Sequence, residues 1–549
     1  MAVHKVMVTA HSVLFALAAI CGVALISVIA KVYAARSDFY KKVKQGMPMP
    51  KWNPIFGHLL FVNDTYSTNK LPPDIQRPDI FRSLSPNFQK SNSLFYVDLW
   101  PFIKPLLIVS SPKYAIQACQ QYDLGKPEDL VPFLHPIAGG NSIFTMNGED
   151  SKHSRSLFSS GFNSSYILNQ TAHIVQEAEV YVDVLRGYAE KRVMFQLDEV
   201  TLNYTRDISG AMTLNTRMHC QQGKKNPLAS ALKHTLGWHF LGELKSPLVR
   251  WSPLIRLISW YNGYQMDQYV SAVLDKRYEE RKRDKSASQA NRAAIDLALA
   301  DYMSGRTTFE NKLDPNFKKW AITQLRLFFF VGHDSTSPTI CYCFYLLSKN
   351  PSALKKLRDE HDRVFGKDRS DTPRLLREQP QLLNQLPYTN AVLKETLRLF
   401  PPAGGMRSGA PGVYLEDDEG NRYPTEGTMV WVLHGTLHRN PKYWKEPKSF
   451  LPERFLVGPD DELYPVKGAW RPFEFGKRDC LGQTLSMLDL RITLAMTVRL
   501  FDVTDAYEEW DLKYPQKRYQ TFDGERAYQI GNGGAHPADG FPCRIKVRE

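Results

Sequence analysis

The sequence lacks the features of a disulfide-stapled or zinc-clustered protein. Its seven cysteines are odd in number and irregularly spaced along 549 residues, which argues against a disulfide framework and indicates a reducing compartment. Cys341 and Cys343 cannot face the same way on a helix, so they make a poor chelating pair. A Gly-x-Gly-x-x-Gly loop is also absent, and with it any recognisable dinucleotide-binding segment.

Basic residues outnumber acidic ones, and they are dispersed along the chain. The formal net charge is +13, which is compatible with nucleic acid, an anionic membrane or an acidic protein as partner. No nucleic-acid-binding motif is present, and the lysines and arginines are spread along the chain. A solvated basic surface is the first interpretation and a docking face for an acidic protein the second. Because 43% of the residues are hydrophobic, the chain can bury a large core.

A long apolar run follows the N-terminus. Between Val6 and Ala30 only His11 can carry a charge, and the run is long enough to cross a bilayer core of about 30 Å. A cleavable signal peptide is the alternative, but the run exceeds a typical signal core and no clear cleavage site precedes the basic residues after it. We predict a membrane anchor at 1–35, a basic, proline-punctuated hinge at 36–58 and one large domain at 59–549.

Two further segments bear on the membrane. More lysine and arginine follow the apolar run than precede it, so a single-pass protein with its domain on the cytoplasmic side of the endoplasmic reticulum is expected. Residues 230–262 combine tryptophan and tyrosine with apolar residues. Core packing explains such a stretch, and so does contact with the membrane interface, where these aromatic residues are favoured.

One stretch near the C-terminus, Phe473–Gly482, has the composition of a loop that presents a ligand. Cys480 lies between Gly476 and Gly482 and precedes an apolar-periodic segment that predicts a helix. At a helix start the dipole and the free N–H groups lower the pKa of a cysteine. The glycines let the backbone approach a flat, bulky group, and Arg478 offers a planar fork to a carboxylate. A lone loop cysteine is more often inert, so the interpretation depends on motifs elsewhere.

A second stretch predicts an interrupted helix. Asp314-Pro315 is a favourable N-cap and first-turn pair, and the apolar pattern after it is long enough to cross a whole domain. In its middle lies Val331–Pro338, whose glycine and proline predict a local distortion with carbonyls and hydroxyls free to hold water. Asp334 beside Ser335 is suited to proton delivery there, although such a pair in a kinked helix is more often structural.

The order Phe-x-x-Gly-x-Arg-x-Cys-x-Gly in Phe473–Gly482 resembles the heme-binding signature of the cytochrome P450 family, and the chain resembles its membrane-anchored fungal members. The interrupted helix is similar to the family's oxygen-activating helix. Val331 replaces its alanine, Ser335 replaces its threonine, and Thr336 keeps the next hydroxyl. The resemblance implies a mainly α fold with small β sheets, one large domain, and heme between two long helices.

The resemblance also implies roles for particular residues. Cys480 is the expected axial thiolate of heme b, and Asp334, Ser335 and Thr336 are the expected catalytic group. The remaining expected heme contacts are Phe473, Gly476, Arg478, Gly482, Arg407 and Arg155. Arg155 belongs to a helix in which the family has a tryptophan where this chain has Ser151. Glu395 and Arg398 are one helical turn apart, and with Arg454 they are expected to form a structural network.

The activity implied is monooxygenation of a lipophilic small molecule. The C-terminal tail, Ala535–Arg544, resembles that of fungal family members in secondary-metabolite pathways, and this resemblance implies such a pathway here. Desaturation, epoxidation and ring coupling are alternatives on the same machinery, and a non-catalytic heme sensor is a distant one. Electrons are expected from NADPH-cytochrome P450 reductase, with cytochrome b5 as an optional donor, docked with help from Lys477, Arg478 and Arg491. No nucleic-acid partner is implied. Residues 528–532 are expected to form a loop that reaches the substrate pocket.

Overall fold

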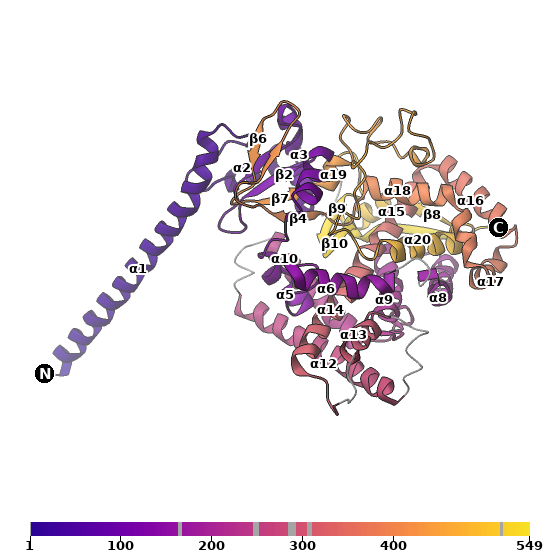
Figure 1. Ribbon diagram of the computed structural model, residues 1–549, viewed down its shortest axis with the longest axis horizontal. Coiled ribbons are helices and arrows are strands. Elements are labelled where there is room, and N and C mark those ends of the chain that lie inside the picture. Colours follow the sequence, from indigo (N-terminus) through magenta and orange to yellow (C-terminus); the bar gives the residue numbers. More distant parts are fainter. Residues whose placement is uncertain are drawn as a thin grey trace.

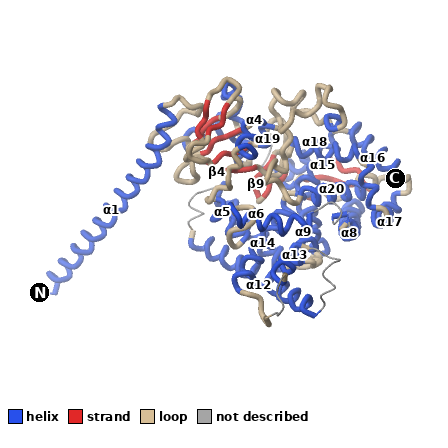
Figure 2. The backbone as a smooth tube through the Cα atoms, in the orientation of Figure 1, coloured by secondary structure: helices blue, strands red, loops and turns tan. Residues whose placement is uncertain are grey.

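Helices dominate the computed structural model, and the strands form small sheets, as predicted (Figures 1 and 2). The structure describes residues 2–162, 167–168, 170–244, 252–283, 293–304, 310–515 and 520–549. The α-helices are α1 (Ala2–Lys44), α2 (Leu59–Thr68), α3 (Arg77–Leu84), α4 (Pro112–Ile116), α5 (Leu130–Ala138), α6 (Gly148–Ser159), α8 (Thr171–Lys191), α9 (Leu197–Leu214), α10 (Pro227–Leu244), α12 (Pro253–Arg283), α13 (Ala294–Met303), α14 (Pro315–Asp334), α15 (Thr336–Lys349), α16 (Pro351–Phe365), α17 (Thr372–Glu378), α18 (Pro387–Leu399), α19 (His434–Leu437), α20 (Gln483–Thr497) and α21 (Tyr507–Lys513). The strands are β1 (Phe95–Val97), β2 (Leu106–Val109), β3 (Phe195–Gln196), β4 (Gly405–Ser408), β5 (Tyr414–Glu416), β6 (Arg422–Pro424), β7 (Met429–Val432), β8 (Phe501–Asp505), β9 (Gln529–Asn532), β10 (Gly534–Pro537) and β11 (Pro542–Val547).

Helix α1 projects from the domain and is fixed to it at its base (Figure 1). Its stretch Ala18–Lys44 is long and apolar enough to cross a membrane. The helix continues to Lys44, so the first part of the predicted hinge is helical. Arg36 is buried and forms an ion pair with Asp98, and the indole N–H of Trp52 donates to the same carboxylate at 2.9 Å. These contacts set the direction in which α1 leaves the domain.

The largest sheet has the order β1-β2-β7-β4. Strand β2 is antiparallel to β1 and parallel to β7, and β4 is antiparallel to β7. Every residue of β2 and β7 is buried, which explains why both read as continuous apolar runs rather than alternating patterns. The edge strand β4 carries Arg407, so the sheet delivers this side chain from its rim toward the interior.

Strands β5 and β6 form a small antiparallel sheet of their own, and the C-terminal region contributes most strands of the other two sheets. Strands β3, β11 and β8 form one, and β9 and β10 form a hairpin that turns at Gly533. The predicted loop at 528–532 is therefore wrong, because Gln529–Asn532 pairs with β10 as strand β9. The turn of this hairpin reaches α14, as described below.

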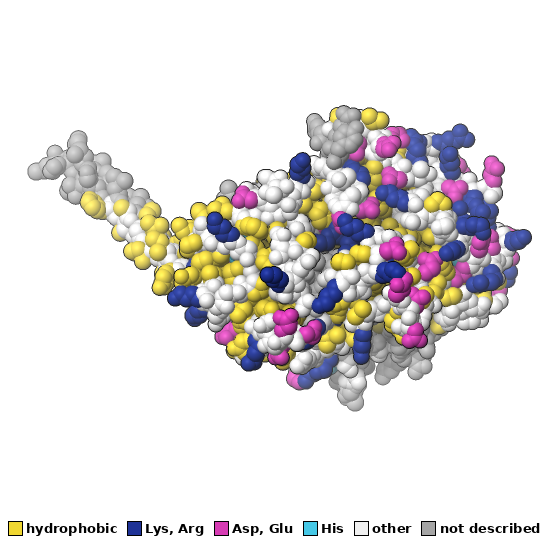
Figure 3. Space-filling model, turned by 90° about the horizontal axis from the view of Figure 1, so that it is seen from above, with side chains coloured by type: hydrophobic (Ala, Val, Ile, Leu, Met, Phe, Trp, Pro, Cys, Tyr) yellow, Lys and Arg dark blue, Asp and Glu magenta, His cyan; other side chains and the backbone are white. Residues whose placement is uncertain are grey.

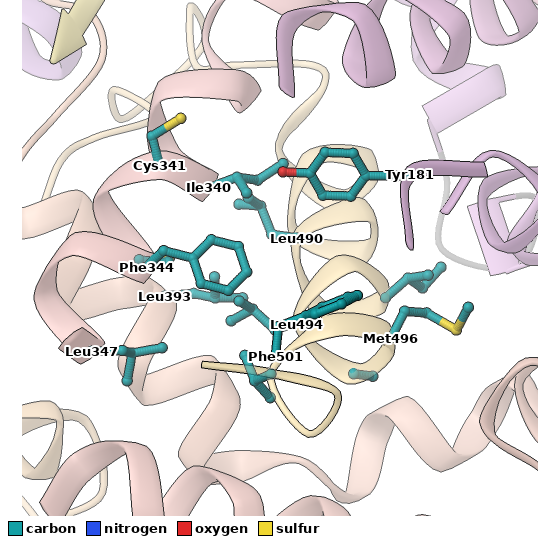
Figure 4. Packing of buried hydrophobic residues seen from close by; sticks show 14 of the residues in the cluster. Tyr181, Ile340, Cys341, Phe344, Leu347, Leu393, Leu490, Leu494, Met496 and Phe501 are labelled. Carbon is teal, nitrogen blue, oxygen red and sulfur yellow. The ribbon is translucent and has the colours of Figure 1, made fainter. Parts of the chain in front are cut away.

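The main core lies where α8, α9, α15, α18 and α20 meet. Figure 4 shows Ile340, Phe344 and Leu347 of α15 facing Leu490 and Leu494 of α20. Helix α14 begins as predicted, because the carboxylate of Asp314 accepts the N–H groups of its second and third residues at 2.9 Å. A strong cap and a packed core hold α14, α15 and α20 in fixed positions, and these helices border the site.

Among the exposed apolar side chains, those at two places bear on the membrane. Figure 3 shows hydrophobic side chains gathered where α1 joins the domain, with acidic and basic side chains interspersed over the far end. The start of α12 lies on the side from which α1 leaves (Figure 1). It exposes Leu254, Leu257, Trp260, Tyr261 and Tyr264, of which Trp260 is 65% exposed. The neighbouring residues 245–251 lie outside the described part of the chain.

Candidate functional site

The loop that presents Cys480 is closed on itself. The N–H of Cys480 donates to the carbonyl of Phe473 at 2.9 Å, directly ahead of α20. Gly476 has a φ of +95°, and a Cβ at this position would lie 3.1 Å from the carbonyl oxygen of Cys119, so a larger residue would be strained. The side chain of Cys480 is exposed and available to a ligand.

The thiol of Cys480 does not have the lowered pKa expected of a helix start. Although it borders open space, desolvation by the surrounding protein raises its pKa. The backbone N–H groups of Gly482 and Gln483 oppose this rise without outweighing it. The N–H groups of the helix start therefore lower the pKa as expected, but burial raises it by more. A coordinated metal ion would supply the missing stabilisation, since a coordinating thiol is deprotonated.

The predicted long helix is interrupted at the predicted place, between α14 and α15. The hydroxyl of Ser335 donates to the carbonyl of Val331 at 3.0 Å, and that of Thr336 to the carbonyl of Gly332 at 3.2 Å. Val331 is 37% exposed at the centre of the helix. The hydroxyl of Thr336 also lies 3.4 Å from that of Ser486 on α20, which places the break beside the helix that follows Cys480.

The carboxylate of Asp334 points away from the exposed face that carries Val331. Asp334 is only 3% exposed, and its carboxylate accepts the N–H of Gly534 from the β9–β10 hairpin. Nε2 of His536 lies 3.4 Å from its Oδ1. The structure therefore places Asp334 and Ser335 side by side in the chain but gives their oxygen atoms different surroundings.

A second group, which we call the open cluster, surrounds Arg407. It comprises Lys126, Arg407, His434, Arg471 and Glu474. Glu474 accepts from His434 at 3.1 Å and from Arg471 at 3.0 Å. The nearest nitrogen of Arg407 is 3.9 Å away, and all three guanidinium nitrogens of this buried side chain lack a hydrogen-bond partner in the part of the chain that the structure describes.

The open cluster has an excess of positive charge. Burial, and after it the charge of Arg407, lower the pKa of Lys126 to about 7, because Glu474 offsets them only in part. The same environment, through burial and the guanidinium groups of Arg155 and Arg407, lowers the pKa of Arg478 to about 10. A buried region that disfavours its own cations favours an anionic ligand.

The other two predicted heme-contacting arginines are engaged with the protein. Arg478 donates to the hydroxyl of Ser151 at 2.5 Å and to the carbonyl of Met146 at 2.8 Å. Arg155 donates to Asp479 of the cysteine loop at 2.8 Å. Ser151 therefore binds Arg478 at the position where the family has tryptophan. Arg155 and Arg478 brace the loop, and Arg407 retains free donors.

The predicted structural network forms a third group, the closed cluster of Glu395, Arg398 and Arg454, all with fully buried side chains. Arg398 makes two bonds of 2.7 Å to Glu395. Its three remaining N–H groups donate to the carbonyls of His438, Pro447 and Ser449. Arg454 reaches the same carboxylate at 3.2 Å. These contacts tie α18 to the segment ahead of the cysteine loop.

Several charged residues near the site were not predicted, because no local sequence pattern marks them. Lys126 and Glu474 approach Arg407 from segments about 350 residues apart. The φ angle of Glu474 is +61°, which is unusual for glutamate, and no sequence pattern predicts it. Two predicted docking residues are less available than expected, because Arg478 is turned inward and Arg491 donates to carbonyls of the protein. Lys477 is 82% exposed.

These features fit a heme bound through its iron and its propionates. Cys480 offers one thiolate, which is the number that heme iron requires from the proximal side. Among the described residues no three histidine, cysteine, aspartate or glutamate side chains gather as a metal cluster. Arg407 offers donors without hydrogen-bond partners among the described residues to a carboxylate, and Val331 at the helix break is partly exposed.

Fold and site together define a heme-thiolate protein, and comparison with known proteins gives the family. The sequence model described as Cytochrome P450 matches residues 47–518, and the chain belongs to this family. It is similar to solved structures of the cytochrome P450DA heme domain (TM-score 0.68, 16% identity, covering 92% of this chain and 98% of that one) and of the cytochrome P450 CYP102L1 (0.70, 18%, 91% and 99%).

The chain is also similar to curated fungal proteins over nearly its whole length. It is 39% identical to cytochrome P450 monooxygenase polC of Polytolypa hystricis over 97% of this chain and 95% of that one. It is 31% identical to cytochrome P450 monooxygenase acrF of Aspergillus aculeatus over 88% and 99%. The protein is therefore a heme-thiolate monooxygenase, and its family implies a redox partner and a lipophilic substrate.

Proposed function

We propose that this protein is a membrane-anchored monooxygenase that holds heme b through Cys480 and oxidises a lipophilic small molecule in a fungal secondary-metabolite pathway. The observation that carries the assignment is the pairing of an exposed cysteine loop with an interrupted helix and the unpaired donors of Arg407. Phe473, Gly476 and Gly482 shape the loop. The fungal monooxygenases polC and acrF support the pathway assignment by similarity.

The bound heme supplies oxygen activation and the oxidising step. The residues of the chain orient and protect it. Arg407, assisted by Lys126, binds a propionate, while Arg478 and Arg155 hold the loop. Ser335 and Thr336 place hydroxyls at the helix break, where ordered water receives protons from Asp334. Val331 adds bulk beside this path and narrows the space for substrate.

We further propose that the electrons come from NADPH-cytochrome P450 reductase, with cytochrome b5 as a second donor. Lys477 is the exposed cation of the loop and contributes to docking an acidic surface. Helix α1 anchors the protein in the endoplasmic reticulum with the domain in the cytoplasm, on the strength of the basic residues that close it. The exposed aromatic residues at the start of α12 rest on the same membrane.

The test is the reduced, CO-bound absorption spectrum of the full chain in microsomes, followed by turnover of candidate metabolites with the reductase. We expect a thiolate-type Soret band from the wild type and from Cys543→Ala, a control at a buried cysteine of β11. We expect the thiolate-type band to be lost in Cys480→Ser. A thiolate-type spectrum from Cys480→Ser would refute the ligand assignment. Mass analysis of products separates hydroxylation from desaturation, epoxidation and coupling, and a heme sensor would give no product.

A further inference from the structure

A buried histidine joins three elements at the helix break. His536 of β10 is 2% exposed, and its Nδ1 lies 2.9 Å from Oδ2 of Asp198 in the first turn of α9. Its Nε2 lies 3.4 Å from Oδ1 of Asp334 at the end of α14, with no other partner among the described residues. The imidazole thus bridges two carboxylates from segments more than 130 residues apart in sequence.

The charge balance requires this histidine to be a cation. Asp198 and Asp334 place two carboxylates in the interior, and among the described residues Arg206 of α9 is a second buried cation that interacts with both. A neutral His536 would leave two buried negative charges facing one positive charge, which is strongly unfavourable. Burial alone would lower the pKa of His536, but the two carboxylates outweigh burial and raise it to about 10.

The hairpin is shaped to lie against Asp334. A Cβ on Gly533, which has a φ of +100°, would lie 2.5 Å from Oδ2 of Asp334, and one on Gly534 would lie 2.9 Å from its backbone oxygen. Two glycines in succession therefore allow the turn to reach the carboxylate. The N–H of Gly534 then donates to it from the same side as His536.

We propose that His536 is a positioning residue that holds the Asp334 carboxylate against the β9–β10 hairpin, and that this position controls how Asp334 takes up a proton and passes it on to water at the helix break. The inference depends on the proposed proton-relay role of Asp334. Ser337 of α15 donates to Asp198 at 3.1 Å, so the bridge also fixes the helix that starts immediately after the break. A shift of the β9–β10 hairpin would break its contacts with the Asp334 carboxylate. The position of this hairpin would therefore affect proton delivery at the helix break.

Two substitutions separate the two ends of the imidazole. His536→Asn keeps a donor near the position of Nδ1, toward Asp198, and loses the group that faces Asp334. His536→Gln keeps a donor near the position of Nε2, toward Asp334. His361→Gln is the matched control, because His361 is a buried histidine whose partner is a hydroxyl, that of Thr389 at 2.9 Å. The reduced CO spectrum first establishes that each variant is folded and holds heme.

The measurement is NADPH oxidation, with the peroxide released per NADPH, by full chain and reductase between pH 6 and pH 9. This readout needs no identified substrate. We expect the wild type and His361→Gln to show little pH dependence, because His536 stays charged across this range. We expect His536→Asn to be slower by about tenfold and His536→Gln by less. Both variants should depend on pH more strongly than the wild type does, because the two carboxylates then lack the cation that lies between them.

The pH dependence of thermal stability is a second test of the charge on His536. Its pKa in the folded protein is above the ordinary value of 6.5, so its contribution to stability is complete below pH 6.5 and is lost as the pH rises to about 10. The difference in thermal midpoint between wild type and His536→Asn should shrink over that interval. If His536→Asn fails to fold, His536→Gln and Asp198→Asn test the same bridge.

The outcomes distinguish the inference from the proposed function. Unchanged rates and pH profiles in both His536 variants, together with loss of activity in Asp334→Asn, would overturn the positioning role alone. Unchanged rates in Asp334→Asn as well would remove Asp334 from proton delivery. Rescue by His536→Gln but not by His536→Asn would assign the effect to the end of the imidazole that faces Asp334.

Discussion

The closed cluster around Glu395 and the open cluster around Arg407 are both buried groups of arginine and glutamate, yet they differ in how far their donors are satisfied. Every N–H group of Arg398 has an acceptor within the protein. No nitrogen of Arg407 has an acceptor among the described residues. A buried cation that is fully paired stabilises a fold, whereas one left unpaired costs stability until a ligand arrives. Arg454 of the closed cluster also has one nitrogen without an acceptor among the described residues, so the two clusters differ in degree: Arg398 is fully paired, whereas Arg407 makes no hydrogen bond there.

The largest effect is expected from breaking the closed cluster. Glu395→Gln leaves Arg398 and Arg454 with an uncompensated buried charge, at a cost of about 3–5 kcal/mol. We expect little or no holoprotein, measured as the heme-to-protein ratio and the thermal midpoint of the purified chain. Glu446→Gln is the control, because Glu446 is exposed in the same segment and its substitution should change stability by less than about 0.5 kcal/mol. Normal holoprotein from Glu395→Gln would contradict the scaffold role.

The open cluster should respond in the opposite way. Arg407→Gln removes a buried charge that makes no hydrogen bond among the described residues and only a 3.9 Å ion pair with Glu474, so the heme-free protein should be at least as stable as the wild type. Heme retention should fall, because a charge-assisted hydrogen bond to a propionate is lost. We expect about tenfold faster transfer of hemin to excess apomyoglobin, which corresponds to about 1.4 kcal/mol. Arg422→Gln, at an exposed arginine of β6, is the control. Slower refolding with unchanged heme transfer would place Arg407 in the scaffold instead.

The comparison also shows what the sequence can reveal. The cysteine loop, the cap at Asp314 and the helix break at Ser335 depend on neighbours in the chain, and all three could be predicted from local pattern. Glu395 and Arg398 are one turn apart and could be paired in the same way. The bridge from His536 to Asp198, 338 residues away, could not, because only the folded chain brings these side chains together.

Predictions from local sequence differ from the structure where contacts with other segments of the fold decide the outcome. The pKa of the Cys480 thiol is raised by desolvation, which helix position cannot reveal. Arg478 and Arg491 turn their long side chains inward to backbone carbonyls, which a count of basic residues cannot show. Strand β9 replaces an expected loop because its partner β10 follows within the next residues and supplies the ladder bonds.

The smallest effect is expected from substituting Lys126. Its Nζ lies 4.6 Å from the centre of the Phe144 ring, and about 350 residues separate it in sequence from Glu474 of the open cluster. Its pKa in the folded protein, about 7, is below the ordinary value of 10.5 because burial disfavours the cation. Its cost to the heme-free protein is therefore complete below about pH 7 and disappears as the pH rises to 10.5. Lys126→Met should raise the thermal midpoint of the heme-free protein at pH 6 more than at pH 10, and should speed hemin transfer about threefold. Lys70→Met, at an exposed lysine, should do neither. A midpoint gain that does not depend on pH would mean that Lys126 is neutral throughout, and the positive charge of the open cluster would then belong to its arginines alone.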